Sequence, residues 1–171
     1  MYKRRNILPV LFMCLFISSC GYKFAGTGSL PKGIKSIYIN MLENASSETG
    51  IENVITNDLI YEFTRINKNL VTNPGNADAE LSGKISEVST NTVSHVNSYT
   101  TQERRVRVNV KIRLSSKGGN VIWGPNDISG SETFDVQQGD KHRTDQNRKE
   151  AIKTLSKRLA EKIYNRMTEN F

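Results

Sequence analysis

Residues 105–114 read Arg-Val-Arg-Val-Asn-Val-Lys-Ile-Arg-Leu, and this stretch decides the fold. Every even-numbered residue in it is aliphatic, whereas every odd-numbered residue is basic or, at Asn109, an amide. A period of two is typical of a β-strand that turns one face to the core and the other to water. Because the apolar face must be covered, the pattern predicts a sheet with a second layer packed on one side.

The strands on either side of this stretch are predicted from the same period. Downstream, Lys117-Gly118-Gly119-Asn120 supplies the permissive residues of a tight hairpin. Val121-Ile122-Trp123 then opens a strand that runs, with interruptions, to Val136. Upstream, apolar and polar residues alternate from Ala79, and we expect one long strand that continues to Tyr99. The three strands form an antiparallel meander.

Two segments repeat apolar residues every three or four positions, which is the period of an amphipathic helix. The first segment carries Ile51, Ile55, Leu59, Phe63 and Ile66, and the second carries Ile152, Leu155, Leu159, Ile163 and Met167. We expect the second helix to run from Asn147 to Phe171. A further strand is predicted over Ser36–Met41, where two isoleucines alternate with more polar residues.

These elements follow one another in the order β-α-β-β-β-α. Two helices with apolar stripes and a sheet with one apolar face are best satisfied when both helices cover that face. The sequence therefore predicts an α+β fold. It is a two-layer sandwich with two helices packed on one face of a largely antiparallel four-stranded sheet.

The first 19 residues have the composition of a signal peptide. Lys3, Arg4 and Arg5 precede an apolar run over residues 7–17, which is too short to span a bilayer as a helix. The run ends in Ser18-Ser19-Cys20, which resembles the lipobox of bacterial lipoproteins. The resemblance implies cleavage before Cys20 and lipid attached to its thiol. The alternative is an ordinary signal peptide that happens to contain a cysteine.

Residues 20–171 suit a single lipid-anchored domain. Gly21 follows the cysteine, and by the same resemblance the destination is the periplasmic side of the outer membrane. The chain holds 24 Lys and Arg against 17 Asp and Glu, and three of the basic residues lie in the signal peptide. The remaining excess of four is mild, so we expect no nucleic-acid partner. Since no cysteine follows Cys20, disulfides are not expected.

The sequence offers little for catalysis. His95 and His142 lie far apart and in no metal-binding or triad spacing. Four acidic residues are interpreted as solvated turn residues: Asp127, Glu132, Asp140 and Asp145. We expect no enzyme activity, no metal site, and no cofactor apart from the covalent lipid on Cys20.

Several short segments, in this order, resemble the LptE family of lipopolysaccharide-assembly lipoproteins. They are Cys20-Gly21-Tyr22-Lys23-Phe24, Leu30-Pro31, the strand with Ile37 and Ile39, Ala77-Asp78-Ala79-Glu80-Leu81-Ser82-Gly83, Asn120-Val121-Ile122-Trp123, and the last helix. The resemblance implies a non-enzymatic plug inside the β-barrel protein LptD, which helps the barrel assemble and helps deliver lipopolysaccharide to the outer leaflet. The competing interpretation is a lipoprotein adaptor, such as a pilotin or chaperone for another outer-membrane complex.

The resemblance also implies that ligand contact occurs at the end of the sheet opposite the lipid. Loops are expected there over residues 95–104 and 137–143. By position and charge, the candidate partners of lipid A phosphates are Arg104, Arg105, Lys141 and Arg143. The alternative is that the basic residues of 105–113 are only the solvated face of the sheet, and that the charges of the last helix form a solvated or barrel-facing surface.

Replacing Cys20 by Ala should block lipidation, because no later residue offers a thiol. The variant should accumulate as uncut or mislocalised precursor, measured by mass spectrometry of the intact protein and by fractionation. A mature N-terminus mapped to any residue other than Cys20 in the unmodified sequence would rule out this processing site.

Overall fold

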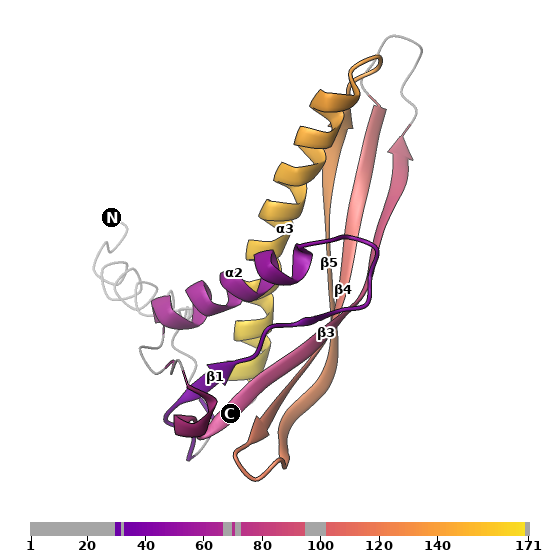
Figure 1. Cartoon of the computed structure of the whole chain (residues 1–171). Coiled ribbons are helices and arrows are strands. Elements are labelled where there is room, and N and C mark those ends of the chain that lie inside the picture. Colours follow the sequence, from indigo (N-terminus) through magenta and orange to yellow (C-terminus); the bar gives the residue numbers. More distant parts are fainter. Residues whose placement is uncertain (1–29, 32, 67–69, 71–72, 95–101, 170–171) are drawn as a thin grey trace, which may run out of the picture.

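The computed structural model describes residues 30–31, 33–66, 70, 73–94 and 102–169. The signal peptide and Cys20 lie outside the described residues. The elements are β1 (Ile37–Ile39), β2 (Glu43–Asn44), α2 (Ile51–Ile66), the 3₁₀ turn η1 (Pro74–Asn76), β3 (Ala79–Ser94), β4 (Gln102–Ser116), β5 (Val121–Val136) and α3 (Lys141–Thr168) (Figure 1). The expected succession of two helices and a three-stranded meander is confirmed. The end predicted for the first long strand, at Tyr99, lies outside the described residues.

The sheet is mixed and has five strands in the described part of the chain. The antiparallel meander β3-β4-β5 agrees with the prediction, but β1 and β2 both pair with β3 in parallel. The predicted four-stranded, largely antiparallel sheet is therefore inexact. Since α2 connects β2 to β3, the chain returns to the same end of the sheet before β3 begins, and a parallel pair results. The two-residue strand β2 is too short to show a period.

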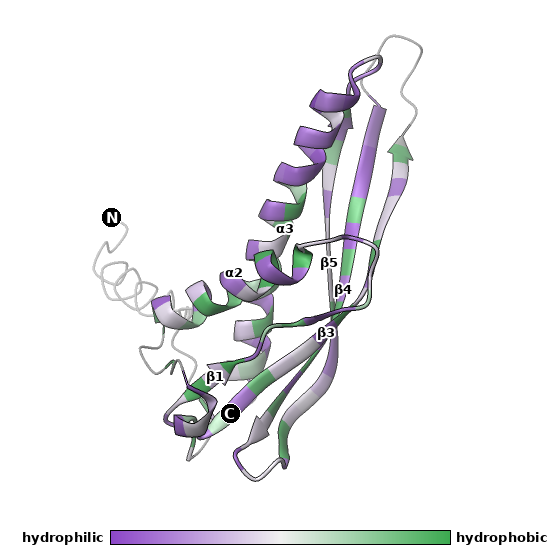
Figure 2. Ribbon diagram, viewed as in Figure 1, coloured by the Kyte–Doolittle hydropathy of each residue, from purple (hydrophilic) through white to green (hydrophobic). Residues whose placement is uncertain are grey.

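The core forms on one face of the meander, as the alternation predicts. The side chains of Val106, Val108, Val110, Ile112 and Leu114 are each no more than 1 % exposed. The neighbouring strands extend this apolar face. Leu81 of β3 lies opposite Leu114 of β4, and Ile128 of β5 lies opposite Val110 of β4. Figure 2 shows hydrophobic residues alternating with hydrophilic ones along β4.

Both helices lie on the apolar side of the sheet (Figure 1). The helix α3 packs against β5, where Gly130 allows close approach: a Cβ there would lie 2.7 Å from Leu155 Cδ1. The helix α2 packs against α3 through Phe63 and Tyr164, whose rings meet edge to face with centroids 5.0 Å apart. One hydrophobic core therefore joins the sheet and both helices.

The outer edge of the sheet is β5, which pairs only with β4 among the described strands. Side chains of α3 bond to two of its carbonyl groups. Lys162 Nζ donates to the oxygen of Ser129 at 2.8 Å, and Asn147 Nδ2 donates to the oxygen of Asp135 at 2.9 Å. Along the length of β5, α3 is thus held by polar contacts as well as by the core.

The segment Ala77–Gly83 joins the parallel and antiparallel parts of the sheet. Asp78 Oδ2 accepts hydrogen bonds from the backbone N–H groups of Lys35 and Ser36 and from the Ser36 hydroxyl, at 2.9–3.0 Å. These bonds, that from Lys35 first, lower the pKa of Asp78. A Cβ at Gly83 would lie 2.7 Å from the Lys111 carbonyl oxygen and 2.5 Å from Ile112 Cδ1. Asp78 is therefore explained by the backbone groups that it binds, and Gly83 by the lack of room for a side chain.

The helix α3 begins at Lys141, six residues before the expected start at Asn147. Asp140 is its N-cap, and its Oδ1 accepts the N–H of Arg143 at 2.9 Å. The prediction was wrong here because the first turns of α3 carry no apolar residue, so the stripe that identified the helix starts only near Ala151. The predicted end at Phe171 lies outside the described residues.

Replacing Val110 by Asp should unfold the domain or nearly so. The site is 1 % exposed, and an unpaired carboxylate in such a core costs on the order of 3 kcal/mol or more, out of a total of about 5–15 kcal/mol. Arg107→Asp places the same group on the exposed face of the same strand and should change the thermal midpoint little. Thermal unfolding followed by circular dichroism measures both midpoints. Equal decreases in the two variants would show that the buried and exposed faces of β4 are assigned wrongly.

An ion pair fastens the segment before α2 to α3, and it should make stability depend on pH. Both Glu48 carboxylate oxygens accept from the Arg148 guanidinium, at 2.6 and 2.8 Å, and each side chain is 28 % exposed. The Arg148 hydrogen bonds hold the pKa of Glu48 below its ordinary value of 4.5. A lowered folded-state pKa stabilises the protein above the unfolded pKa, and the contribution is lost as pH falls through the folded value.

Glu48→Gln should therefore lower the urea midpoint at pH 7, and its difference from the unmodified protein should shrink as the pH falls below the ordinary value of 4.5. Urea titrations of both proteins at pH 7 and at acid pH test this. A difference that stays the same at both values would mean that Glu48 acts through its shape rather than its charge.

Candidate functional site

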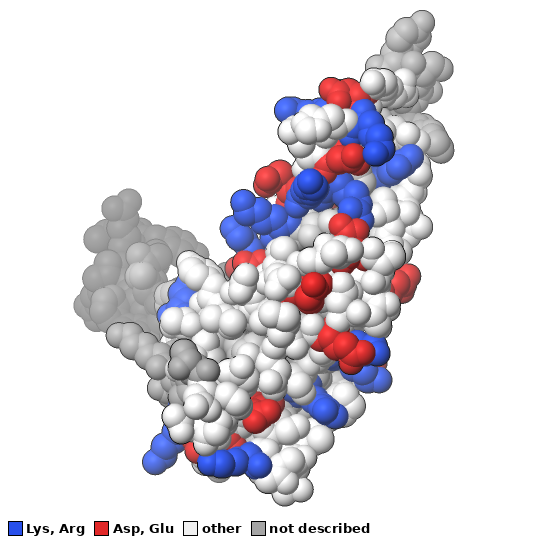
Figure 3. Space-filling model, in the orientation of Figure 1, with Lys and Arg blue, Asp and Glu red and all other residues white. Residues whose placement is uncertain are grey.

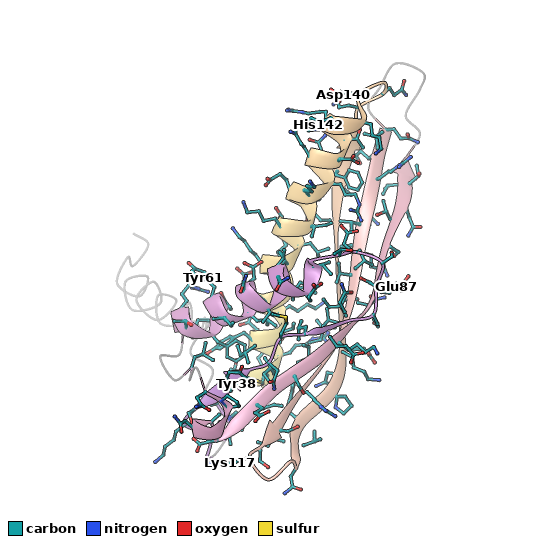
Figure 4. All side chains as sticks on the ribbon, viewed as in Figure 1. Tyr38, Tyr61, Glu87, Lys117, Asp140 and His142 are labelled. Atoms are coloured by element: carbon teal, nitrogen blue, oxygen red, sulfur yellow. The ribbon has the colours of Figure 1, made fainter. Side chains whose placement is uncertain are left out.

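One end of the sheet, here called the distal end, gathers the N-terminal part of β4, the C-terminal part of β5 and the first turn of α3. The connection between β5 and α3 is tightly bonded. Thr144 Oγ1 accepts the N–H of Gln137 at 3.0 Å and donates to the Asp140 carbonyl at 3.0 Å. Asp140 and His142 lie together at this end in Figure 4. The first turn of α3 is thus held at a fixed place against the end of β5.

All four predicted phosphate partners lie at the distal end, and all are exposed. The elements that carry them differ from the prediction, which placed them in two loops. Arg104 and Arg105 belong to β4, and Lys141 and Arg143 belong to the first turn of α3. Regular pairing continues through these positions of β4, and a longer helix replaces the expected second loop. The first loop, from His95 onward, lies mostly outside the described residues.

The four residues do not form one cluster, because strand alternation separates the two arginines of β4. Arg104 pairs in register with Phe134, which is buried, so it belongs to the face that α3 covers. Arg105 pairs with Thr133 and belongs to the open face of the sheet. The structure therefore brings Arg104 to the same side as Lys141 and Arg143, and leaves Arg105 on the other side.

The first turn of α3 carries positive charge where a helix favours negative charge. Lys141 and Arg143 follow the cap, and no acidic residue lies in that turn. Lys141 has only an exposed partner, Asp145, at 3.5 Å, with side chains 92 % and 52 % exposed. The helix dipole disfavours cations at this end. These basic residues therefore gain nothing from the helix dipole, and their exposed groups remain able to bind an anion.

The open face of the sheet is less basic than the sequence of β4 suggests. In register, Asp127 of β5 lies opposite Lys111, and Glu87 of β3 lies opposite Asn109 and accepts its side-chain N–H at 3.0 Å. Lys84 is paired with Glu43 at 2.7 Å. Neighbouring strands thus supply acids beside the basic column. This balance favours the interpretation of a solvated sheet face over that of a ligand site along the whole strand.

Several roles were missed because their partners are distant in the sequence. Asp127, Glu132 and Asp145 were interpreted as solvated turn residues, which is wrong, because none of them lies in a turn. Asp127 and Glu132 lie in β5 and Asp145 lies in α3, and Glu132 forms an ion pair with Arg158 of α3. Asp140 caps α3. An aspartate just ahead of a long polar segment is the signal that could have located this cap. No such local signal exists for the pairing of Glu48 with Arg148.

The described residues contain no group of three or more His, Cys, Asp or Glu able to hold a metal ion. Neither of their helices combines the length and apolar character needed to cross a bilayer. What the distal end offers chemically is a set of exposed arginine and lysine donors, which suit phosphate or carboxylate groups.

Solved structures share this fold at low sequence identity. Lipoprotein B from Nitrosomonas europaea is 15 % identical, with a TM-score of 0.54 over 82 % of this chain and 85 % of that one. The rare lipoprotein B from Shewanella oneidensis is 15 % identical, with a TM-score of 0.52 over 77 % and 96 %. A minor lipoprotein from Acinetobacter baumannii is 13 % identical, with a TM-score of 0.51 over 83 % and 95 %.

Among curated protein sequences, none matches this chain significantly. The sequence profile of the LptE family, described as lipopolysaccharide-assembly, matches residues 34–167. That range covers the five strands of the described residues and nearly all of the last helix. The chain therefore belongs to the LptE family of lipopolysaccharide-assembly lipoproteins.

Proposed function

We propose that the protein is a non-enzymatic plug of an LptD-like β-barrel in the outer membrane, which assists the assembly of the barrel and the delivery of lipopolysaccharide to the outer leaflet. Family membership supports this role. Residues 1–19 are removed, Cys20 carries the lipid that holds the protein on the periplasmic side, and residues 20–171 form one domain. The protein uses no cofactor beyond that lipid and has no nucleic-acid partner.

The shape of the domain suits a plug. Its three long strands have 15 or 16 residues each, so the meander is about 50 Å long. In Figure 1 the meander and α3 extend well beyond α2, which gives the domain an elongated outline. An elongated body with a charged outer surface fits the polar interior of a large barrel.

The observation that carries direct lipopolysaccharide binding is the cationic first turn of α3, on the same side of the sheet as Arg104. Charge that opposes the helix dipole needs another reason to be there, and lipid A phosphates are anions that Arg and Lys bind well. Because Arg104, Lys141 and Arg143 share one side of the distal end, they are the set that one ligand can reach. Arg105, on the open face, is the fourth candidate and contacts the ligand only if it also wraps around the sheet.

The second candidate function is an adaptor or pilotin-type chaperone for another outer-membrane complex. Affinity purification of the tagged, full-length protein from outer membranes, followed by mass spectrometry, separates the two. Recovery of an LptD-like barrel in stoichiometric amount supports the plug. Recovery of a secretin or another complex in its place would favour the adaptor.

Reversing Lys141 and Arg143 to Glu should weaken the binding of purified lipopolysaccharide by about tenfold, since each exposed ion pair contributes modestly. Titration by fluorescence or calorimetry measures this. Reversing Arg105 alone tests whether the ligand also reaches the open face.

The matched control reverses Lys111 and Arg113, two cations of β4 far from the distal end. It introduces the same change in net charge and should leave the affinity nearly unchanged. If both double variants weaken binding equally, the effect is diffuse electrostatics. If neither does, the distal cations are solvated surface and the protein acts only as plug and assembly factor.

A further inference from the structure

A groove of about 530 Å³ lies between the N-terminal half of α2 and the middle of α3. Its apolar lining comes from Ile51 and Ile152, which are 2 % and 8 % exposed, and from Val54, which is 37 % exposed. None of the candidate lipopolysaccharide-binding cations lines it. The groove is therefore a separate feature of the surface, with an apolar floor that is partly open to solvent.

Three lysines and one acid, Glu150, line the groove from α3. Lys149, Lys153 and Lys157 are four residues apart, so they share one face of the helix over about 12 Å. In the described part of the chain, none of the three has a hydrogen-bond or ion-pair partner. Like charges at this spacing destabilise a helix by about 0.2–0.5 kcal/mol per pair. Figure 3 shows basic side chains, with acidic ones among them, over the N-terminal part of α3, above a largely uncharged surface over α2.

The α2 side of the groove carries acids that already have partners. Asp58 Oδ2 accepts a hydrogen bond from the buried hydroxyl of Ser156 at 2.5 Å, and Glu48 is held by Arg148. Lysines thus outnumber acids three to one on the α3 wall, the acids of the α2 side have partners, and an apolar floor lies between the walls. A flat anionic bilayer does not match this arrangement, because it would meet the carboxylates of the α2 side and could not reach the floor.

We propose that this groove docks an acidic, amphipathic segment of a partner protein. Carboxylates of that segment pair with Lys149, Lys153 and Lys157, and an apolar side chain covers Val54 and Ile152. Carboxylates four residues apart on a helix, or two apart on a strand, recur at about 6–7 Å, which matches the spacing of the lysines. This surface goes beyond the proposed function and does not depend on where lipopolysaccharide binds.

The test uses the full-length protein in its own cells, with a photoreactive benzoylphenylalanine in place of Val54. Crosslinked products are isolated and the attached peptide is sequenced by mass spectrometry. The expected product is a protein adduct whose peptide has at least two acidic residues within about ten. Thr154 is the matched control position, since it is exposed on α3 but lines the opposite cleft, beside β5. Its adducts should differ.

The triple reversal Lys149→Glu, Lys153→Glu and Lys157→Glu should lower the yield of the Val54 adduct by about tenfold without changing adducts at Thr154. The triple Gln variant, which removes charge without reversing it, should give an intermediate loss at an unchanged thermal midpoint. Purified triple variants should still bind lipopolysaccharide, so failure here is distinguishable from failure of the distal site.

Three kinds of result would overturn the docking proposal. One is no adduct, or a lipid adduct, at Val54. Another is a peptide without acidic residues, or a yield that does not respond to the lysines. The third is binding of the unmodified protein to phosphatidylglycerol–phosphatidylethanolamine vesicles that the triple reversal abolishes, since that would make the three lysines a membrane contact.

Discussion

Five aliphatic side chains of β4, from Val106 to Leu114, are buried on one face of the sheet. The rest of the architecture follows from the need to cover them. Because β3 and β5 flank β4 within the sheet, its apolar side chains can be covered only by a second layer packed on that face. The helix α3 covers these side chains on the β5 side, with Gly130 allowing close approach. The helix α2 completes the layer through α3 and the short parallel strands. The opposite face is left to polar side chains.

The elements that depend on this burial were predictable from sequence, because burial imposes a period on the residues. The period of two located the meander, and the period of three to four located both helices. Features that rest on pairing between distant residues left no such pattern. The parallel strand β2 has two residues, and the Glu48–Arg148 ion pair joins residues 100 positions apart. The start of α3 is set by the cap at Asp140, whose helix shows no apolar stripe for its first turns.

The candidate site shows the same division. Charge and position in the fold were sufficient to select Arg104, Arg105, Lys141 and Arg143 as residues of one end of the molecule. They were not sufficient to say which of them face the same way, since that depends on how far β4 extends and where α3 begins. Once β4 is known to include residue 104, alternation alone separates it from Arg105. The balance of charge on the open face depends on register, which brings Asp127 and Glu87 beside the basic column.

The contacts between α3 and β5 bear on whether copies of the protein can associate through their sheets. An edge strand of 16 residues is a template on which other chains can add strands and aggregate. Here the carbonyls of Ser129 and Asp135 already accept hydrogen bonds from α3, and Pro125 provides no amide hydrogen. A strand added to β5 would therefore compete with α3 for two backbone carbonyls, and it would receive no hydrogen bond from the nitrogen of Pro125. The helix that covers the core thus also makes the β5 edge a poorer template for strand addition.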